Sequence, residues 1–303
     1  MPADTLGGKV RALARRKGAL ILAHNYQLGE VQDAADFVGD SLELAMRASK
    51  ARARLILFCG VHFMAETAKM LNPDATVLEP DPNAGCPLAN MLNIRQLRRL
   101  KSEHPGAVVV TYVNSSAEVK AESDVCCTSG NALKVVAGIP RDKEIIFVPD
   151  KSLGAYVSSK SGRPLIFWEG YCPTHHRITA EAILQAKREH PAAKVVVHPE
   201  CTPDVTALAD EVASTSGILR YAAGTPYTEY IIGTEIGLLH RLEKDNPGKA
   251  FYSPTRFADC PNMKLNTLEK MLWALEDMQY EVTVPADTAA RARRAVERML
   301  EFV

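Results

Sequence analysis

The sequence predicts an α/β protein made of three homologous three-layer (αβα) domains with parallel sheets, arranged around a pseudo-threefold axis. Two observations predict this fold. Apolar runs of four or five residues alternate with helix-length segments, a pattern typical of β-α-β units with buried parallel strands. In addition, one arrangement of polar and apolar residues recurs three times along the 303 residues at nearly constant spacing, which indicates an internal repeat.

The three repeats align at His24, Tyr112 and His198, each of which follows an apolar run. Equivalent valines and aspartates then recur at fixed distances: Val31, Val119, Val205, Asp36, Asp124 and Asp210. A hydroxyl residue follows at a third fixed distance: Ser41, Ser129 and Thr215. A Cys-Pro pair stands near the end of each repeat: Cys86, Cys172 and Cys260. Ungapped agreement at so many positions is poorly explained by chance.

Each repeat of about 87 residues supplies three predicted strands and about three helices. The first strands begin at Leu20, Val108 and Val195, and each leads into a polar loop. The second strands are expected at 55–59, 145–148 and 230–232, and the third at 76–78, 165–167 and 251–252. We predict domains at 1–86, 87–172 and 173–282. The last apolar run, 282–284, and the Arg-rich helix after Pro285 should pack back on the first domain through segment 283–303.

The charge balance and hydropathy narrow the class of partner. The chain has 36 Lys and Arg against 36 Asp and Glu, so it lacks the bulk attraction that nucleic acid or an anionic membrane surface would exert. No apolar run approaches the ~20 residues of a membrane span. The N-terminal segment carries basic residues throughout and lacks the charged-then-apolar pattern of a signal peptide. We therefore expect a cytoplasmic protein with small-molecule partners and without nucleic-acid or membrane partners.

Three of the seven cysteines fit a metal centre. Cys86, Cys172 and Cys260 occupy equivalent turns, and a threefold arrangement would bring their thiols together. Thiolates select zinc or iron–sulfur clusters. Three equivalent ligands do not complete a structural zinc site, whereas a [4Fe–4S] cluster held by three cysteines leaves one iron open as a Lewis acid. Packing as small buried residues is expected for Cys59 and is the alternative for Cys126 and Cys127, while Cys201 has no assigned role.

The hydroxyl residues and polar loops complete the candidate site. Ser41, Ser129 and Thr215 each open a predicted helix, where they would act as N-caps and where free N–H groups could bind anions. The loops after the first strands carry His24, Tyr26, Tyr112, Asn114, His198 and Glu200. Glu200 is the one carboxylate of this set and is the natural general acid or base. Helix capping or loop packing is favoured for His62, Asp150 and Glu235, and His175 and His176 either support the cysteine site or are solvated.

Nearly the whole chain resembles the quinolinate synthase A family. The matching stretches are AHNYQ (23–27), DFVGDSLELA (36–45), TYVNSSAEVK (111–120), CTSGNA (127–132), PDKSLGAY (149–156), HPEC (198–201), STS (214–216), IGTEIG (232–237) and CPNMKLNTLE (260–269). The resemblance implies an iron–sulfur enzyme of NAD biosynthesis. It would condense iminoaspartate with dihydroxyacetone phosphate to quinolinate, with loss of phosphate and two waters. A separate aspartate-oxidising enzyme would be its functional partner.

The resemblance also implies residue roles. One [4Fe–4S] cluster per chain would be held by Cys86, Cys172 and Cys260. The residues implied as catalytic are Glu200, Tyr26, His24 and His198, and those implied to bind substrate are His24, Ser41, Tyr112, Asn114, Ser129, His198, Glu200 and Thr215. Two alternatives stay open. An aconitase-type hydro-lyase would use the same open iron without a condensation, and a non-enzymatic cluster or zinc protein would serve electron transfer or sensing.

Overall fold

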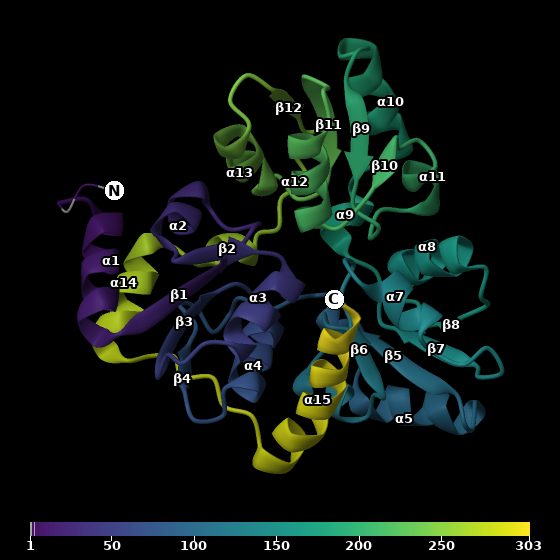
Figure 1. Cartoon of the computed structure of the whole chain (residues 1–303), viewed down its shortest axis with the longest axis horizontal. Helices are drawn as coiled ribbons and strands as arrows, with labels where there is room; N and C mark the ends of the chain where they lie inside the picture. The colour runs from purple at the N-terminus through teal and green to yellow at the C-terminus, as the bar shows by residue number, and fades with distance from the viewer. Residues whose placement is uncertain (1, 3) are drawn as a thin grey trace.

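Three four-stranded sheets surround the centre of the molecule in the computed structural model, which describes residue 2 and residues 4–303 (Figure 1). All strand pairs within the sheets are parallel, and helices flank each sheet. The strand orders are β2-β1-β3-β4, β6-β5-β7-β8 and β10-β9-β11-β12, so the same order occurs three times. The predicted α/β class with three parallel sheets is therefore confirmed.

Each sheet is formed by one continuous stretch of the chain. The first stretch contains α1 (Leu6–Lys17), β1 (Ala19–His24), α2 (Gly29–Ala34), β2 (Phe37–Gly39), α3 (Ser41–Ser49), β3 (Leu55–Cys59), α4 (His62–Leu71) and β4 (Thr76–Leu78). The second contains α5 (Ile94–Glu103), β5 (Val108–Tyr112), α6 (Ala117–Ala121), β6 (Val125–Cys127), α7 (Ala132–Ala137), β7 (Ile145–Val148), α8 (Lys151–Ser161) and β8 (Ile166–Phe167). The third contains α10 (Ala180–Glu189), β9 (Lys194–Val197), α11 (Pro203–Thr206), β10 (Glu211–Val212), α12 (Thr215–Gly224), β11 (Glu229–Gly233), α13 (Leu238–Asp245) and β12 (Ala250–Tyr252).

Short helices follow the three sheets, and two longer ones close the chain. They are the 3₁₀ turns Ala89–Met91, Met263–Leu265 and Leu300–Phe302, the helix α9 (Pro173–His176), and the helices α14 (Leu268–Asp277) and α15 (Ala286–Met299). Each cysteine turn therefore follows the last strand of its sheet and precedes the next helix. This placement brings all three turns to the centre.

Each sheet has four strands, one more than the repeat pattern predicts. The additional strands, β2, β6 and β10, span only two or three residues each. The aspartate that recurs in each repeat explains their position. The carboxylates of Asp36, Asp124 and Asp210 each accept a hydrogen bond of 2.8 Å from a backbone N–H of the neighbouring first strand. The threefold aspartate thus helps to fix the register of a short edge strand.

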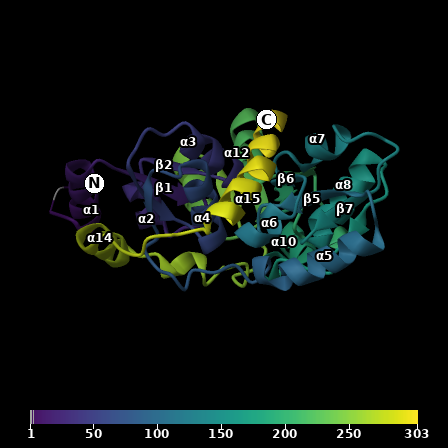
Figure 2. The same cartoon turned by 90° about the horizontal axis from the view of Figure 1, so that it is seen from below.

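The C-terminal segment returns to the earlier part of the chain, as Figure 2 shows for α14 and α15. Helix α14 packs against α1, and α15 packs against α6, β6 and α4. The apolar run at 282–284 adds no parallel strand among the described residues. Instead, the backbone N–H of Val282 donates to Val77 at 2.8 Å, and Glu281 forms an antiparallel bridge with Leu78. α15 thus contacts elements of both the first and the second range. The domain limits of 1–86, 87–172 and 173–282 stay a prediction.

The first strands β1, β5 and β9 end at the centre of the molecule, and the polar loops follow them. The carboxyl ends of parallel strands are where loops carry binding groups in α/β proteins. Among the described residues, no helix is long and apolar enough to cross a membrane.

Candidate active site

A cavity of about 120 Å³ lies at the centre and is lined by residues of all three sheet units. All twelve residues that the sequence singles out for the metal centre, catalysis or substrate binding line it: His24, Tyr26, Ser41, Cys86, Tyr112, Asn114, Ser129, Cys172, His198, Glu200, Thr215 and Cys260. Residues as far apart in sequence as His24 and Cys260 therefore meet in one place. The roles of these residues remain proposals.

His24 and His198 have the same local geometry in two different units. The Nδ1 atom of His24 accepts a hydrogen bond of 3.2 Å from the backbone N–H of Tyr26, and Nδ1 of His198 accepts one of 3.3 Å from that of Glu200. Burial lowers the pKa of both histidines to about 3. Each ring is therefore neutral and carries its hydrogen on Nε2. Both side chains can donate a hydrogen bond at the cavity.

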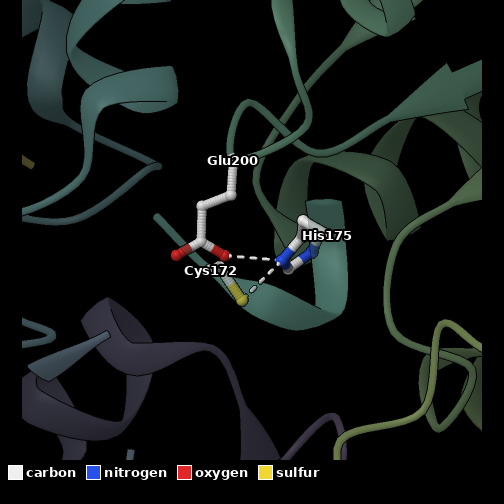
Figure 3. Close-up of side chains that lie close together, drawn as sticks. All are labelled: Cys172, His175 and Glu200. Carbon is white, nitrogen blue, oxygen red and sulfur yellow. Dashed lines mark hydrogen bonds and ion pairs between the residues drawn. The ribbon is translucent and has the colours of Figure 1, made fainter. Parts of the chain in front are cut away.

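Cys172, His175 and Glu200 form a cluster at the cavity, in which His175 and Glu200 are buried and Cys172 is partly buried (Figure 3). Nδ1 of His175 lies 2.9 Å from Oε2 of Glu200 and 3.2 Å from the sulfur of Cys172. The ligand atoms of these three residues all lie within 4.8 Å of one another, so they could hold a metal ion. The other carboxylate oxygen of Glu200, Oε1, is buried without a hydrogen-bond partner among the described residues. Such an atom is available to a ligand.

The sequence left open whether His175 supports the cysteine site or is solvated. A signal was present, since His175 follows Cys172 by three residues, and one turn of helix brings such residues to the same side. Helix α9 supplies that turn. The adjacent His176 has different partners: its Nε2 lies 3.0 Å from the hydroxyl of Ser152, and its ring stacks on Tyr171.

A chain of hydrogen bonds connects Tyr26 with Glu200. The hydroxyl of Tyr26 lies 2.6 Å from Oγ1 of Thr234, and Oγ1 of Thr234 lies 2.9 Å from Nε2 of His175. The opposite nitrogen of His175 contacts Glu200. Burial raises the pKa of Tyr26 well above its ordinary value, so its hydroxyl is protonated. Thr234 is a further residue that the sequence analysis missed.

The charge state of Glu200 reflects opposing effects. Burial alone raises the pKa of its carboxyl group, because the charged form loses its hydration. The neighbouring His175, through its charge and its hydrogen bond to the carboxylate, favours the charged form and outweighs burial, so the pKa is lowered to about 2. Glu200 is therefore a carboxylate at neutral pH.

The hydroxyl residues lie close to helix N-termini, but they are not the capping residues. Ser41 and Thr215 are the first residues of α3 and α12, whose caps are the preceding Asp40 and Ser214. Ser129 lies in the turn before α7, which begins only at Ala132. The predicted capping role is therefore wrong, because the caps stand one residue earlier, or two later at Asn131. The three hydroxyl groups are left available for other partners.

The seven cysteines fall into two groups. Cys86, Cys172 and Cys260 line the cavity and are not fully buried, and desolvation raises the pKa of Cys86 to about 12. Smaller increases in the pKa of Cys86 come from Glu200 and from Cys260, because these groups lie near one another. The remaining four are buried in strands or in the third core cluster: Cys59, Cys126, Cys127 and Cys201.

Three other polar residues have structural contacts. Glu235 lines the cavity wall, but its Oε1 accepts from the backbone N–H of Cys260 at 3.0 Å and pairs with Lys264 at 2.8 Å. The carboxylate of Asp150 caps α8 through the backbone N–H of Leu153. His62 pairs with Glu79 at 3.0 Å. Glu235 nevertheless acts near the site, because it holds the turn that carries Cys260.

Fold and site together define a three-unit α/β protein whose parallel sheets direct one cysteine each, with histidine, tyrosine and glutamate side chains, into a shared central cavity. Comparison with known proteins identifies the family. Residues 8–301 match the family model described as quinolinate synthetase A protein, and the chain belongs to that family.

Several named relatives are similar along their full length. The chain is 55% identical over 300 residues to a quinolinate synthase of Dehalococcoides mccartyi strain CBDB1, covering 99% of both chains. It is 53% identical over 292 residues to a quinolinate synthase of Methanosarcina barkeri, covering 96% of both. A quinolinate synthase of Thermodesulfovibrio yellowstonii is 53% identical over 296 residues, covering 97% of both.

Proposed function

We propose that this protein is an enzyme of NAD biosynthesis that acts in the cytoplasm and condenses iminoaspartate with dihydroxyacetone phosphate. The products are quinolinate, phosphate and two waters. One observation carries the proposal: a thiol from each unit and the polar residues of all three first-strand loops line the same cavity. The names of the full-length relatives support it. The finer roles of the residues are part of the proposal.

The residues present fit a [4Fe–4S] cluster, one per chain. Cys86, Cys172 and Cys260 would hold it, because three thiols meet at one cavity and no fourth cysteine lines it among the described residues. The unpartnered Oε1 of Glu200 adds an acceptor at the same place. When bound, such a cluster supplies one open iron as a Lewis acid for a hydroxyl or carboxylate oxygen.

The hydroxyl residues account for anion binding in a protein without net charge. Ser41 and Thr215 lie at the N-termini of α3 and α12, where N–H groups and the helix dipole favour negative charge. With Ser129, they would hold the carboxylates and the phosphate of the substrates. Local donors of this kind need no excess of lysine or arginine.

Proton transfers are assigned to the hydrogen-bonded chain from Tyr26 to Glu200. Glu200 is the carboxylate that would remove a proton from substrate, and Tyr26 is a neutral hydroxyl that would donate one. His175 and Thr234 join the two by contacts of 2.6–2.9 Å. His24 would donate from Nε2 to a substrate oxygen, and His198 would act through Ser129, whose Oγ lies 3.0 Å from its Nε2. Burial of the cavity would shield the imine substrate from hydrolysis.

One observation suggests a different metal site. Cys172, His175 and Glu200 could hold a single divalent ion such as zinc. That arrangement uses only one of the three equivalent cysteines and leaves Cys86 and Cys260 without a role. We therefore prefer the cluster, and metal analysis separates the two.

The test begins with anaerobic purification, an absorption spectrum and counts of iron and sulfide per chain. We expect a broad band near ~400 nm and about four irons. Quinolinate should then form from dihydroxyacetone phosphate and iminoaspartate generated by an aspartate-oxidising enzyme. A colourless protein with one zinc would overturn the cluster. Normal cluster content without a product that depends on dihydroxyacetone phosphate would favour a hydro-lyase instead.

A further inference from the structure

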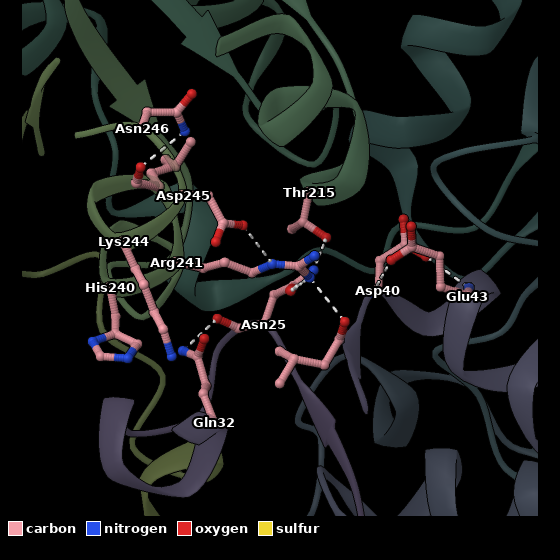
Figure 4. Close-up of polar contacts among 12 residues, drawn as sticks. Asn25, Gln32, Asp40, Glu43, Thr215, His240, Arg241, Lys244, Asp245 and Asn246 are labelled. Carbon is pink, nitrogen blue, oxygen red and sulfur yellow. Dashed lines mark hydrogen bonds and ion pairs between the residues drawn. The ribbon is translucent and has the colours of Figure 1, made fainter. Parts of the chain in front are cut away.

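A second hydrogen-bonded chain crosses from α13 in the third unit to the loop after β1 and back to the start of α12 (Figure 4). Nη1 of Arg241 donates to Oδ1 of Asn25 at 2.9 Å, and Nδ2 of Asn25 donates to Oγ1 of Thr215 at 3.1 Å. Asn25 is fully buried and follows His24 directly. Thr215 lines the cavity. The chain therefore ends at the candidate site.

The direction of this chain is set by chemistry. A guanidinium group has only donors, so the atom of Asn25 that faces Arg241 must be its carbonyl oxygen. The amide nitrogen must then face Thr215. Arg241 is itself held in place, because Nη1 also donates to the carbonyl oxygen of Val38 at 2.8 Å and Nε pairs with Asp245 at 3.2 Å. The amide of Asn25 cannot turn over without losing a bond at both ends.

The consequence falls on the hydroxyl group of Thr215. Its oxygen accepts from Asn25, so its own hydrogen needs a different acceptor. Among residue 2 and residues 4–303, the Thr215 hydroxyl donates no hydrogen bond. The neighbouring Asp40 also lines the cavity, but its Oδ1 already accepts from the backbone N–H groups of Leu42 and Glu43, and its Oδ2 accepts from the hydroxyl of Ser214 at 3.4 Å. The Thr215 hydroxyl is thus a donor at the cavity wall that is available to a ligand.

The same arrangement occurs at a second hydroxyl. Nδ1 of His198 accepts from the backbone N–H of Glu200, so Nε2 carries the hydrogen and donates to Oγ of Ser129 at 3.0 Å. Ser129 is therefore also held with its oxygen as acceptor. The side chain that donates to the hydroxyl differs between the two places: His198 donates to Ser129, and Asn25 donates to Thr215. The repeat positions equivalent to Asn25 are occupied by Val113 and Pro199, which have no side-chain amide. The chain through Asn25 is therefore not a by-product of the repeat.

We propose that Asn25 and Arg241 are positioning residues that hold Thr215 as a hydrogen-bond donor to an anionic group of the ligand, a carboxylate or a phosphate. This inference rests on the proposed function, since it identifies how that site recognises its anionic substrates. Neither residue lines the cavity. Their effect passes through the hydroxyl hydrogen of one threonine.

The test reverses the direction of the chain with Asn25→Asp. The new carboxylate keeps Arg241 as its partner, now in an ion pair, but it has no N–H to donate. The hydroxyl of Thr215 would then donate to that carboxylate and turn its hydrogen away from the cavity. Binding of two probes, quinolinate and inorganic phosphate, is measured on the cluster-loaded enzyme by calorimetry. We expect about tenfold weaker binding of the probe that Thr215 recognises, which also tells carboxylate from phosphate.

A double-mutant cycle with Thr215→Val separates this effect from simple repulsion by the new charge. If the chain acts through the hydroxyl, Asn25→Asp should weaken binding in the wild-type background and have little further effect beside Thr215→Val. An equal loss in both backgrounds, or no loss in either, would overturn the proposal. Melting temperatures and iron content of all variants show that the fold is retained.

Arg241→Met tests the other end of the chain and has a matched control. Without Arg241 the amide of Asn25 is free to turn over, so KM for the anionic substrate should rise several-fold while kcat changes less. Lys244→Met removes an ion pair between α13 and Asp33 of α2 and should leave KM unchanged. Equal effects of the two would overturn the proposal. If the wild-type protein makes quinolinate but Asn25 and Thr215 show no coupling in the cycle, only this inference is overturned. If the wild-type protein binds neither probe, the proposed function is overturned as well.

Discussion

The imidazole of His175 lies 2.9 Å from the carboxylate of Glu200, and the two side chains are only 1% and 4% exposed. The contact joins helix α9 to the loop after β9, two segments that α10 and β9 separate in the sequence. A buried pair of this kind is costly to break, because removal of one partner leaves the other without compensation. Both residues also border the cavity. Their contact is therefore a sensitive point for mutagenesis.

Replacement of Glu200 by glutamine should abolish turnover. Glutamine keeps the size of the side chain but cannot take up a proton, and loss of a general acid or base costs about 10²–10⁴-fold in rate. Quinolinate formation is measured beside the absorption spectrum and iron content, which should stay normal. Glu169→Gln is the control, since Glu169 is an exposed partner of Lys151. Full activity of Glu200→Gln would remove Glu200 from the mechanism.

Replacement by glutamine should have different effects on the adjacent residues His175 and His176. His175→Gln breaks the chain between Tyr26 and Glu200, so kcat should fall at least about tenfold. His176→Gln should stay within about twofold of wild type, because the contacts of His176 are with Ser152 and Tyr171, which do not line the cavity. Steady-state kinetics of the two variants at equal iron content give the answer. Similar losses in both would indicate a general effect on α9 rather than a role of His175.

The three cavity cysteines should be equivalent in metal analysis. Serine at position 86, 172 or 260 removes a thiolate, and each variant should lose most of its iron and its band near ~400 nm. Cys201→Ala is the control. It is buried in the third core cluster, and its cost should appear in the melting temperature, by about 1 kcal/mol of unfolding free energy. Full iron content in any of the three serine variants would contradict the ligand set.

The contact between α15 and the second unit should depend on pH. Glu122 accepts from Arg98 at 2.8 Å and from Arg291 of α15 at 3.1 Å, and Arg98 is the main reason that its pKa is lowered from 4.5. A lowered pKa in the folded state stabilises the protein above pH 4.5, and this contribution is lost as pH falls through the folded-state value. Glu122→Gln should therefore cost about 1 kcal/mol at pH 7.

The difference in unfolding free energy between wild type and Glu122→Gln should become smaller at acidic pH, because wild-type Glu122 also becomes neutral there. Thermal unfolding of both proteins is followed from pH 7 downward. The control is Glu103→Gln, which breaks an exposed pair with Arg99 within α5 and should cost less than about 0.5 kcal/mol. A difference between wild type and Glu122→Gln that is constant with pH would mean that packing, and not charge, is lost.

Much of the site could be predicted from local pattern. Strands of a parallel sheet end at one edge, so residues that follow equivalent strands in a repeat must meet when the repeats share an axis. His24, Tyr112 and His198 satisfy this condition and line the cavity together. The three Cys-Pro turns follow the same rule. The repeat also singled out Asp36, Asp124 and Asp210, although their bonds to the neighbouring strands became visible only in the structure.

The parts that sequence reasoning missed depend on contacts between units. The pairing of His175 with Glu200, and the chain from Arg241 through Asn25 to Thr215, join side chains that no periodic pattern relates. The docking of α15 against α4 and α6 is of the same kind. Sequence by itself determined the class of fold, its repeat and the residues around the cavity, because hydrophobic period and strand polarity are local properties. Tertiary structure alone decided which side chains contact one another and in which direction they donate, because that follows from how three separate sheets pack together.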